Sequence, residues 1–232
     1  MKNPRPKIER ARRAQARLRA ASSRSGRSGE IVLRLVGDVG ETITFDKVER
    51  ELRRAPRADV RVEIDTPGGS LPEAFKIYRT LRAHQGRVSG HVAKKCCSAG
   101  VVILLACRHR TAAGGATLMI HGASLEPRKK SPKRWTAAAY DQYRRRLERD
   151  DAEMAELIAK HTGARLSWIK TELATEDDLP IAEALKRGFI HEVTDVAPAV
   201  PVKSGHRCRM SSTAPPSARL AARRALAVAV MT

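Results

Sequence analysis

The sequence predicts an α/β fold with a mostly parallel sheet, and three observations lead to this prediction. Short apolar stretches typical of strands alternate with stretches in which apolar residues recur at helical spacing. Apolar residues make up 42% of the chain and aromatic residues only 3%, so the expected core is aliphatic. The length of 232 residues suits one domain of ordinary size with tails.

The first half of the chain contains three predicted strands, each followed by a predicted helix. The second strand has the clearest pattern, because apolar and polar residues alternate from Asp59 to Asp65, which is the period of a strand. The first helix carries Phe45, Val48 and Leu52 on one face. The full set is strands at 31–36, 59–65 and 88–92, with helices starting near residue 44, after residue 69 and at residue 100.

The second half begins with a fourth predicted strand at 118–120, followed by a basic loop at 122–135. A long helix is expected from about residue 136 to residue 160, because apolar residues recur there at helical spacing. Gly163 stands just past its end, where glycine commonly terminates a helix. A short helix at 181–187 completes the domain.

The formal net charge of +20 is concentrated at the two ends of the chain. Residues 2–29 contain ten Lys or Arg and one Glu, and residues 197–232 contain six Lys or Arg and no acid. Such composition predicts solvated arms that contact nucleic acid or anionic lipid. We therefore expect a basic flexible arm at 1–29, a folded domain at 30–196 and a basic tail at 197–232. Nucleic acid is a candidate partner of the tails only.

The longest apolar run, residues 99–107, is shorter than the ~20 residues that a membrane span needs. A cytoplasmic protein is expected, although the Arg- and Ser-rich N-terminus also fits an organellar transit peptide. None of the four cysteines stands at C-x-x-C spacing, and no Cys/His set indicates zinc, so no metal is expected. No phosphate-binding G-x-x-x-x-G-K-[ST] loop is present, and no cofactor is expected.

The stretch K-K-C-C-S-A-G, residues 94–100, joins the third strand to an apolar helix. Ser98 is expected at the N-terminus of that helix, where free N–H groups favour negative charge. Taken alone, Ser98 is either a helix cap or a nucleophile. In the second case, the N–H of Ala99 would point to where the oxyanion of the attacked acyl group forms. Cys96 and Cys97 are interpreted as small buried hydrophobes. A Lys94 or Lys95 base for Ser98 is the less favoured alternative.

His121 and the turn Pro67-Gly68-Gly69 also follow predicted strands. Ligands of open α/β sheets gather at the carboxyl ends of the strands, so these residues and Ser98 are expected at one sheet edge. A lone histidine or a lone Gly-Gly turn is weak evidence of function. Their coincidence at one edge is stronger evidence than either residue alone.

Four motifs, in this order and spacing, resemble those of the Clp protease proteolytic subunit. They are D-T-P-G-G-S-L at 65–71, C-C-S-A-G at 96–100, M-I-H at 119–121 and E-A-L-K-R-G-F-I at 183–190. The resemblance covers roughly residues 30–195. It implies a crotonase-like fold of repeated β-β-α units with a protruding, handle-like long helix. It also implies a serine endopeptidase that hydrolyses unfolded proteins through an acyl-enzyme.

The resemblance assigns roles to individual residues: Ser98 as nucleophile, His121 as general base, and the backbone N–H groups of Gly69 and Ala99 as the oxyanion hole. It implies a homo-oligomeric ring assembly with an unfoldase ATPase as partner. An ordinary amphipathic helix that covers the sheet is the alternative interpretation of the long helix.

The sequence departs from the family pattern at three places. The expected triad aspartate falls on Glu176, with Asp177 as the alternative acid and Asp178 as a weaker one. Lys94-Lys95 replaces a segment that usually contains glycine, and Gly122-Ala123 replaces the usual Gln-Pro after the histidine. The last change lies where substrate backbone is expected to run.

Three other functions remain as alternatives. A phage head-maturation protease shares the fold and the motifs. A crotonase-type acyl-CoA enzyme would need oxyanion N–H groups but no Ser/His pair, so the presence of Ser98 and His121 argues against it. A non-catalytic nucleic-acid-binding protein would depend on the basic tails, and its binding would be steeply salt-dependent.

Overall fold

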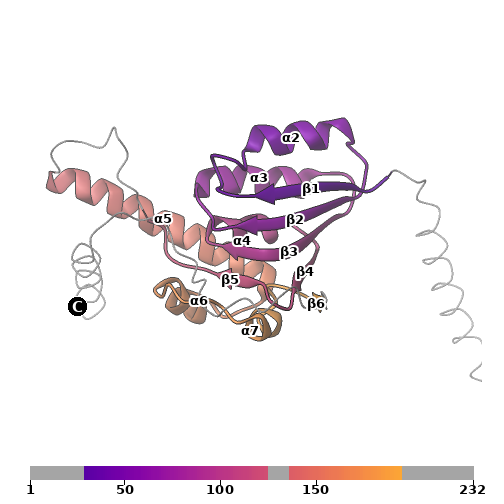
Figure 1. Ribbon diagram of the computed structural model, residues 1–232. Coiled ribbons are helices and arrows are strands. Elements are labelled where there is room, and N and C mark those ends of the chain that lie inside the picture. Colours follow the sequence, from indigo (N-terminus) through magenta and orange to yellow (C-terminus); the bar gives the residue numbers. More distant parts are fainter. Residues whose placement is uncertain (1–28, 125–135, 195–232) are drawn as a thin grey trace, which may run out of the picture.

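The computed structural model describes residues 29–124 and 136–194, and its centre is a six-stranded sheet covered by helices (Figure 1). Strands β1 to β4 lie side by side in chain order, β6 follows β4, and β5 pairs with β3. All of these pairs are parallel, which confirms the predicted α/β class. The strands are β1 (Ile31–Val36), β2 (Val60–Thr66), β3 (Val88–Cys97), β4 (His109–Ala113), β5 (Thr117–Met119) and β6 (Glu192–Thr194).

The helices begin and end where local chemistry favours it. Ser70 caps α3 by accepting a hydrogen bond from the backbone N–H of Glu73. Gly163 ends α5 in the left-handed conformation, at φ 74°, as the sequence predicts. The helices are α2 (Phe45–Arg54), α3 (Leu71–Ala83), α4 (Ala99–Leu104), α5 (Ala137–Thr162), α6 (Leu166–Leu173) and α7 (Ile181–Lys186).

Strand β3 is longer than predicted, because it continues past Val92 to Cys97. Its first half pairs with β4, and its second half leaves β4 and pairs with β5. The register between β2 and β3 shifts between Ile64 and Thr66, which bends the sheet at this point. Lys94 and Lys95 therefore lie within the strand and not in a loop after it.

The sequence pattern missed two strands. Strand β4 (His109–Ala113) has only alanines as apolar residues, and β6 is three residues long. Threonine is the one β-branched residue of β4, so the strand signal is weak there. Strand β6 has a valine and a threonine but is too short to show an alternating pattern. The predicted strand at 118–120 corresponds to β5, and the predicted helix at 100–106 to α4.

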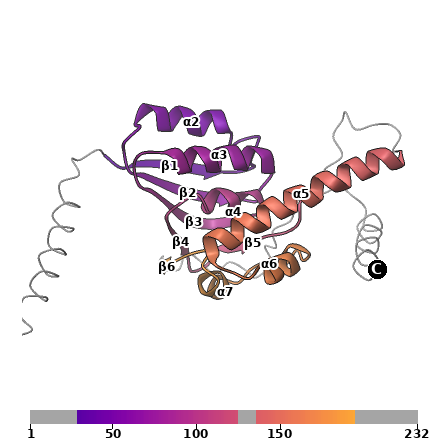
Figure 2. The same ribbon diagram turned by 180° about the vertical axis from the view of Figure 1, so that it is seen from behind.

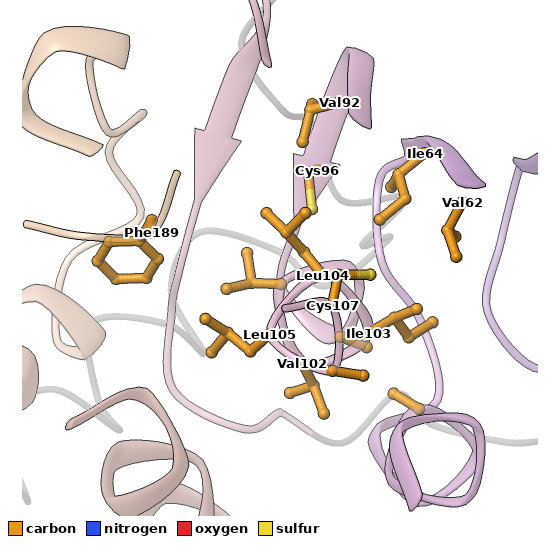
Figure 3. Close-up of a cluster of buried hydrophobic side chains, with 14 of the residues drawn as sticks. Val62, Ile64, Val92, Cys96, Val102, Ile103, Leu104, Leu105, Cys107 and Phe189 are labelled. Atoms are coloured by element: carbon orange, nitrogen blue, oxygen red, sulfur yellow. The ribbon is translucent and has the colours of Figure 1, made fainter. Parts of the chain in front are cut away.

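Helix α4 is the centre of the core, and all six of its residues are buried. Figure 3 shows Leu104 and Cys107 facing Cys96 of β3, with Phe189 on the opposite side of the cluster. Burial of a large aliphatic side chain contributes about 2 kcal/mol, so α4 is held firmly against β2 and β3. The residue directly before α4, Ser98, is therefore fixed relative to the sheet.

Helix α5 has two different halves. Its C-terminal half packs on the core through Met154, Ala155 and Ile158, which are buried. Its N-terminal half projects beyond the sheet, as both views show (Figures 1 and 2). The protruding long helix predicted for this fold is therefore present, and its C-terminal half also covers the sheet.

Arg110 of β4 joins the C-terminal third of the domain to the sheet. Its side chain is 4% exposed, and it donates hydrogen bonds only to backbone carbonyls and to His191 among the described residues. The carbonyl acceptors are those of Cys107 (3.0 Å), His161 (3.1 Å), Gly188 (2.8 Å) and Phe189 (2.7 Å). The guanidinium thus fixes the end of α5 and the segment between α7 and β6. The predicted arms at 1–29 and 197–232 lie outside the described residues, except for Gly29.

Candidate active site

Ser98 occupies a sharp turn between β3 and α4. Its φ of 53° and ψ of −122° make it the one non-glycine residue with positive φ in the described part of the chain. Such a backbone conformation costs about 1–3 kcal/mol and is concentrated at functional sites. A strained strand-to-helix turn is also how a nucleophile elbow exposes a serine hydroxyl. Ser98 stands at the N-cap position of α4, but unlike Ser70 it makes no side-chain capping hydrogen bond, so its hydroxyl is not used to cap the helix.

Gly68 lies against this turn, and the next residue, Gly69, lies against Val39. A Cβ on Gly68 would fall 2.7 Å from Cβ of Ser98, and a Cβ on Gly69 would collide with the carbonyl oxygen of Val39. Both glycines also have positive φ, 109° and 131°. Side chains are therefore excluded here on two grounds, space and backbone conformation.

Two backbone N–H groups beside Ser98 have no acceptor among the described residues. The N–H of Gly68 donates to Oγ1 of Thr66 at 3.0 Å, whereas no such bond is made by the N–H of Gly69. The N–H of Ala99, at the first position of α4, is one of the groups that a helix leaves unpaired. These are the two groups that the sequence predicts for an oxyanion hole.

His121 follows β5 and lies at the same sheet edge as Ser98. The backbone N–H of Ser98 donates to the carbonyl oxygen of Met119 at 2.7 Å, so the two segments are directly bonded. The His121 ring is 5% exposed, and its Nε2 has no hydrogen-bond partner among the described residues. Burial lowers the pKa of His121 below 6.5, while a backbone hydrogen bond at Gly122 and the charges of Glu176 and Asp151 raise it. The ring is thus a neutral base near pH 7, with an unpaired nitrogen.

Of the predicted acids, the structure brings Glu176 within electrostatic reach of His121. The loop that carries Glu176 is fixed beside β5, because the N–H of Leu179 donates to the carbonyl oxygen of Leu118 at 2.7 Å. The charge of Asp177 acts instead on Glu172, whose pKa is raised first by burial and then by that charge. Glu176, Asp177 and Asp178 are all exposed.

Asp151 of α5 is a second carboxylate near His121, which sequence reasoning missed. Its Oδ1 accepts a hydrogen bond of 2.5 Å from the backbone N–H of Ala123. Burial raises the pKa of Asp151, while this hydrogen bond lowers it. One signal was present in the sequence: Asp151 stands three, four and seven positions before the buried residues of α5, so it shares their face.

The other reactive groups of residues 94–100 are placed away from the chemistry. The side chains of Cys96 and Cys97 are fully buried, and Cys96 is a free thiol, as predicted for a small packing residue. Burial raises the pKa of the free thiol of Cys96 far above its usual range, so no thiolate forms there. Lys94 is exposed on β3, and Lys95 is partly buried beside Thr117 of β5.

The part of the chain that the structure describes contains no group of three or more His, Cys, Asp or Glu residues placed to hold a metal ion. Within the same residues, no helix combines the length and the apolar character that crossing a membrane requires.

Comparison with known proteins places the chain in a peptidase family. The family model described as Clp protease matches residues 44–197, about two-thirds of the chain, and the chain therefore belongs to the Clp protease family. A Streptomyces coelicolor protein described as ATP-dependent Clp protease proteolytic subunit-like is 26% identical over 160 residues, covering 66% of this chain and 72% of that protein.

A mutant of ClpP1 from Listeria monocytogenes has the same fold. Its structure superposes with a TM-score of 0.62 at 18% identity, covering 72% of this chain and 92% of that chain. Together, the family and the fold support a peptidase of the ClpP type.

Proposed function

We propose that this protein is a serine endopeptidase of the Clp proteolytic-subunit type, which hydrolyses peptide bonds of unfolded proteins. The observation that carries the proposal is the strained turn at Ser98. Its hydroxyl makes no capping hydrogen bond, Gly68 is packed against it, and its backbone N–H is bonded to the segment that leads to His121. A structural serine has no need of this backbone conformation.

The proposed reaction has two halves. Oγ of Ser98 attacks the scissile carbonyl carbon while His121 takes the hydroxyl proton. The oxyanion is stabilised by the N–H groups of Gly69 and Ala99. His121 then gives its proton to the leaving amine, and an acyl-enzyme remains on Ser98. Water, deprotonated by His121, hydrolyses this ester and restores the free hydroxyl.

Glu176 is the proposed acid that orients His121 and stabilises its protonated form. Its charge acts on His121, whereas that of Asp177 acts on Glu172, which favours Glu176 over the alternative acid. Glutamate serves this role in other folds.

The assembly is proposed from the family. A homo-oligomeric ring with Ser98 inside, working in the cytoplasm with an unfoldase ATPase, is the arrangement that the resemblance implies. The projecting half of α5 supports an oligomer. Tyr140 is 61% exposed there, and the buried residues of α5 all belong to the other half. Access to the ring interior would then control which proteins are cleaved.

Labelling with a fluorophosphonate, which reacts with activated serines, tests this proposal. We expect the wild type to be labelled and Ser98→Ala and His121→Ala to be unlabelled. Glu176→Gln should react more slowly, while Asp177→Asn should react at close to the wild-type rate. Ser167→Ala, at an exposed position on α6, is the matched control and should be labelled normally. A folded, assembled wild type that is not labelled would overturn the proposal.

A further inference from the structure

We propose that Asp151 is a positioning residue for His121, a role that rests on the proposed catalytic function. It holds the segment after His121 against α5 and supplies a second negative charge to the protonated ring. This places part of the catalytic machinery on the long helix, in addition to the loop that carries Glu176.

The first support is geometric. The two residues that follow His121 are bound to two different helices: Gly122 donates its N–H to the carbonyl oxygen of Leu173 at 2.7 Å, and Ala123 donates to Asp151. A Cβ on Gly122 would fall 3.3 Å from that oxygen of Leu173 and 3.4 Å from Oδ2 of Asp151. The backbone is therefore closely enclosed, and Asp151 fixes where the chain leaves the imidazole.

The second support is electrostatic. His121 is buried, which disfavours its charged form, and the charges that oppose this effect are those of Glu176 and Asp151. The charged groups that act on Asp151 are Asp150, its neighbour on the same helix, and His121. During acylation the ring becomes positively charged, and a nearby carboxylate stabilises that charge.

The two carboxylates differ in their surroundings. Glu176 is exposed, and its effect is therefore weakened by water and by salt. Asp151 is partly buried between α5 and the segment after His121, and it is screened less. Asp151 is expected to keep its influence on His121 at high ionic strength, where that of Glu176 declines.

Four variants separate charge from hydrogen bonding. Asp151→Asn keeps an oxygen acceptor for Ala123 but removes the charge, and Asp151→Ala removes both. Asp151→Glu keeps the charge. The matched control, Glu153→Gln, removes a negative charge from an exposed position of the same helix. The pKa of His121 is measured by NMR titration in a Ser98→Ala background, and its signal is assigned by its loss in His121→Gln.

We expect Asp151→Asn to lower the pKa of His121 by roughly half a unit, while Asp151→Glu and Glu153→Gln leave it close to the reference value. When Ser98 is present, the labelling rate is measured as a function of pH. The acid side of this pH profile should move to lower pH by the same amount in Asp151→Asn. Asp151→Ala should in addition lose rate on the plateau. An unchanged pKa in Asp151→Asn would overturn the inference, because a purely structural role predicts that result.

The titration also separates this inference from the proposed function. If the wild type is not labelled, the peptidase proposal fails, whereas the NMR titration still decides whether Asp151 acts on His121. If labelling succeeds and the titration shows no effect of Asp151, the peptidase proposal stands and the role of Asp151 is rejected.

Discussion

Gly68 and Ser98 are packed so closely that no side-chain atom can be added to Gly68 without displacing its neighbours. A Cβ on Gly68 would fall 2.7 Å from Cβ of Ser98 and 2.8 Å from the carbonyl oxygen of Cys97. The second oxyanion candidate, Gly69, follows directly. The position of the proposed nucleophile therefore depends on the glycine turn that follows β2.

Replacing Gly68 with alanine should displace Ser98. We expect the fluorophosphonate labelling rate to fall roughly 100-fold, since a shift of about 1 Å can cost that much. Stability should fall by about 2 kcal/mol, because alanine is also strained at φ 109°. Gly115→Ala is the matched control, since nothing lies within 4 Å of a Cβ there. Labelling of Gly68→Ala at the rate of the control would contradict this account of the site.

The backbone strain at Ser98 can be measured without any substrate. Alanine keeps the unfavourable conformation, whereas glycine adopts positive φ readily. We therefore expect Ser98→Gly to be more stable than Ser98→Ala by about 1 kcal/mol, measured by urea unfolding. At Ser167, which lies inside helix α6, the order should reverse, with glycine less stable than alanine by about 1 kcal/mol. Equal stability of the two Ser98 variants would argue against strain at this turn.

Stability should fall as the pH drops below about 6.5. The pKa values of His121, His161 and His191 are all lowered, in each case mainly by burial. In the unfolded chain these rings bind protons near their ordinary pKa of about 6.5, while in the folded protein they remain neutral to lower pH. The unfolded state then binds more protons, and acid favours it. A urea midpoint as high at pH 5.5 as at pH 7.5 would show that burial does not control these rings.

Arg110→Lys should be strongly destabilising although the positive charge is kept. A lysine ammonium cannot reach the carbonyl groups that the guanidinium binds on three segments, and each buried carbonyl left unpaired costs about 1–3 kcal/mol. We expect a loss of about 3 kcal/mol or more in urea unfolding. Arg108→Lys, at an exposed position two residues away, should change stability by less than about 0.5 kcal/mol. Similar effects of the two substitutions would exclude the proposed role of Arg110.

The sequence predicts the elements whose periodicity is strong and misses those whose pairing depends on distant partners. Strand β2 alternates clearly, and Val48 and Leu52 mark the buried face of α2, so β2 and the start of α2 are predicted almost to the residue. The far half of β3 is missed because Lys94 and Lys95 are typical of solvent-exposed loops. They are accommodated because β5 arrives as a new neighbour, which no local pattern shows.

The site shows the same division. Ser98 and His121 follow predicted strands, so their common edge follows from parallel topology alone. Asp151 could not be placed, because its contact with Ala123 joins residues 28 positions apart across the loop at 122–135. Its charge on the buried face of α5 was visible in the sequence, but its partner was not. Whether Glu176 or Asp177 is the acid depends on the path of one loop, which the motif spacing leaves open.

The contacts of Arg110 also have a consequence for the order in which the chain folds. Strands β1 to β4 are consecutive neighbours and can pair as they are synthesised, N-terminal end first. Arg110 is then made before three of its four carbonyl acceptors, and the carbonyl of Phe189 follows 79 residues later. Until the segment that carries Phe189 is made, the guanidinium must stay hydrated, so the sheet remains uncovered beside β4. Closure of the C-terminal third onto Arg110 is therefore expected to be a late step in folding, because the contacts of Arg110 with this third span 51 to 81 positions in sequence.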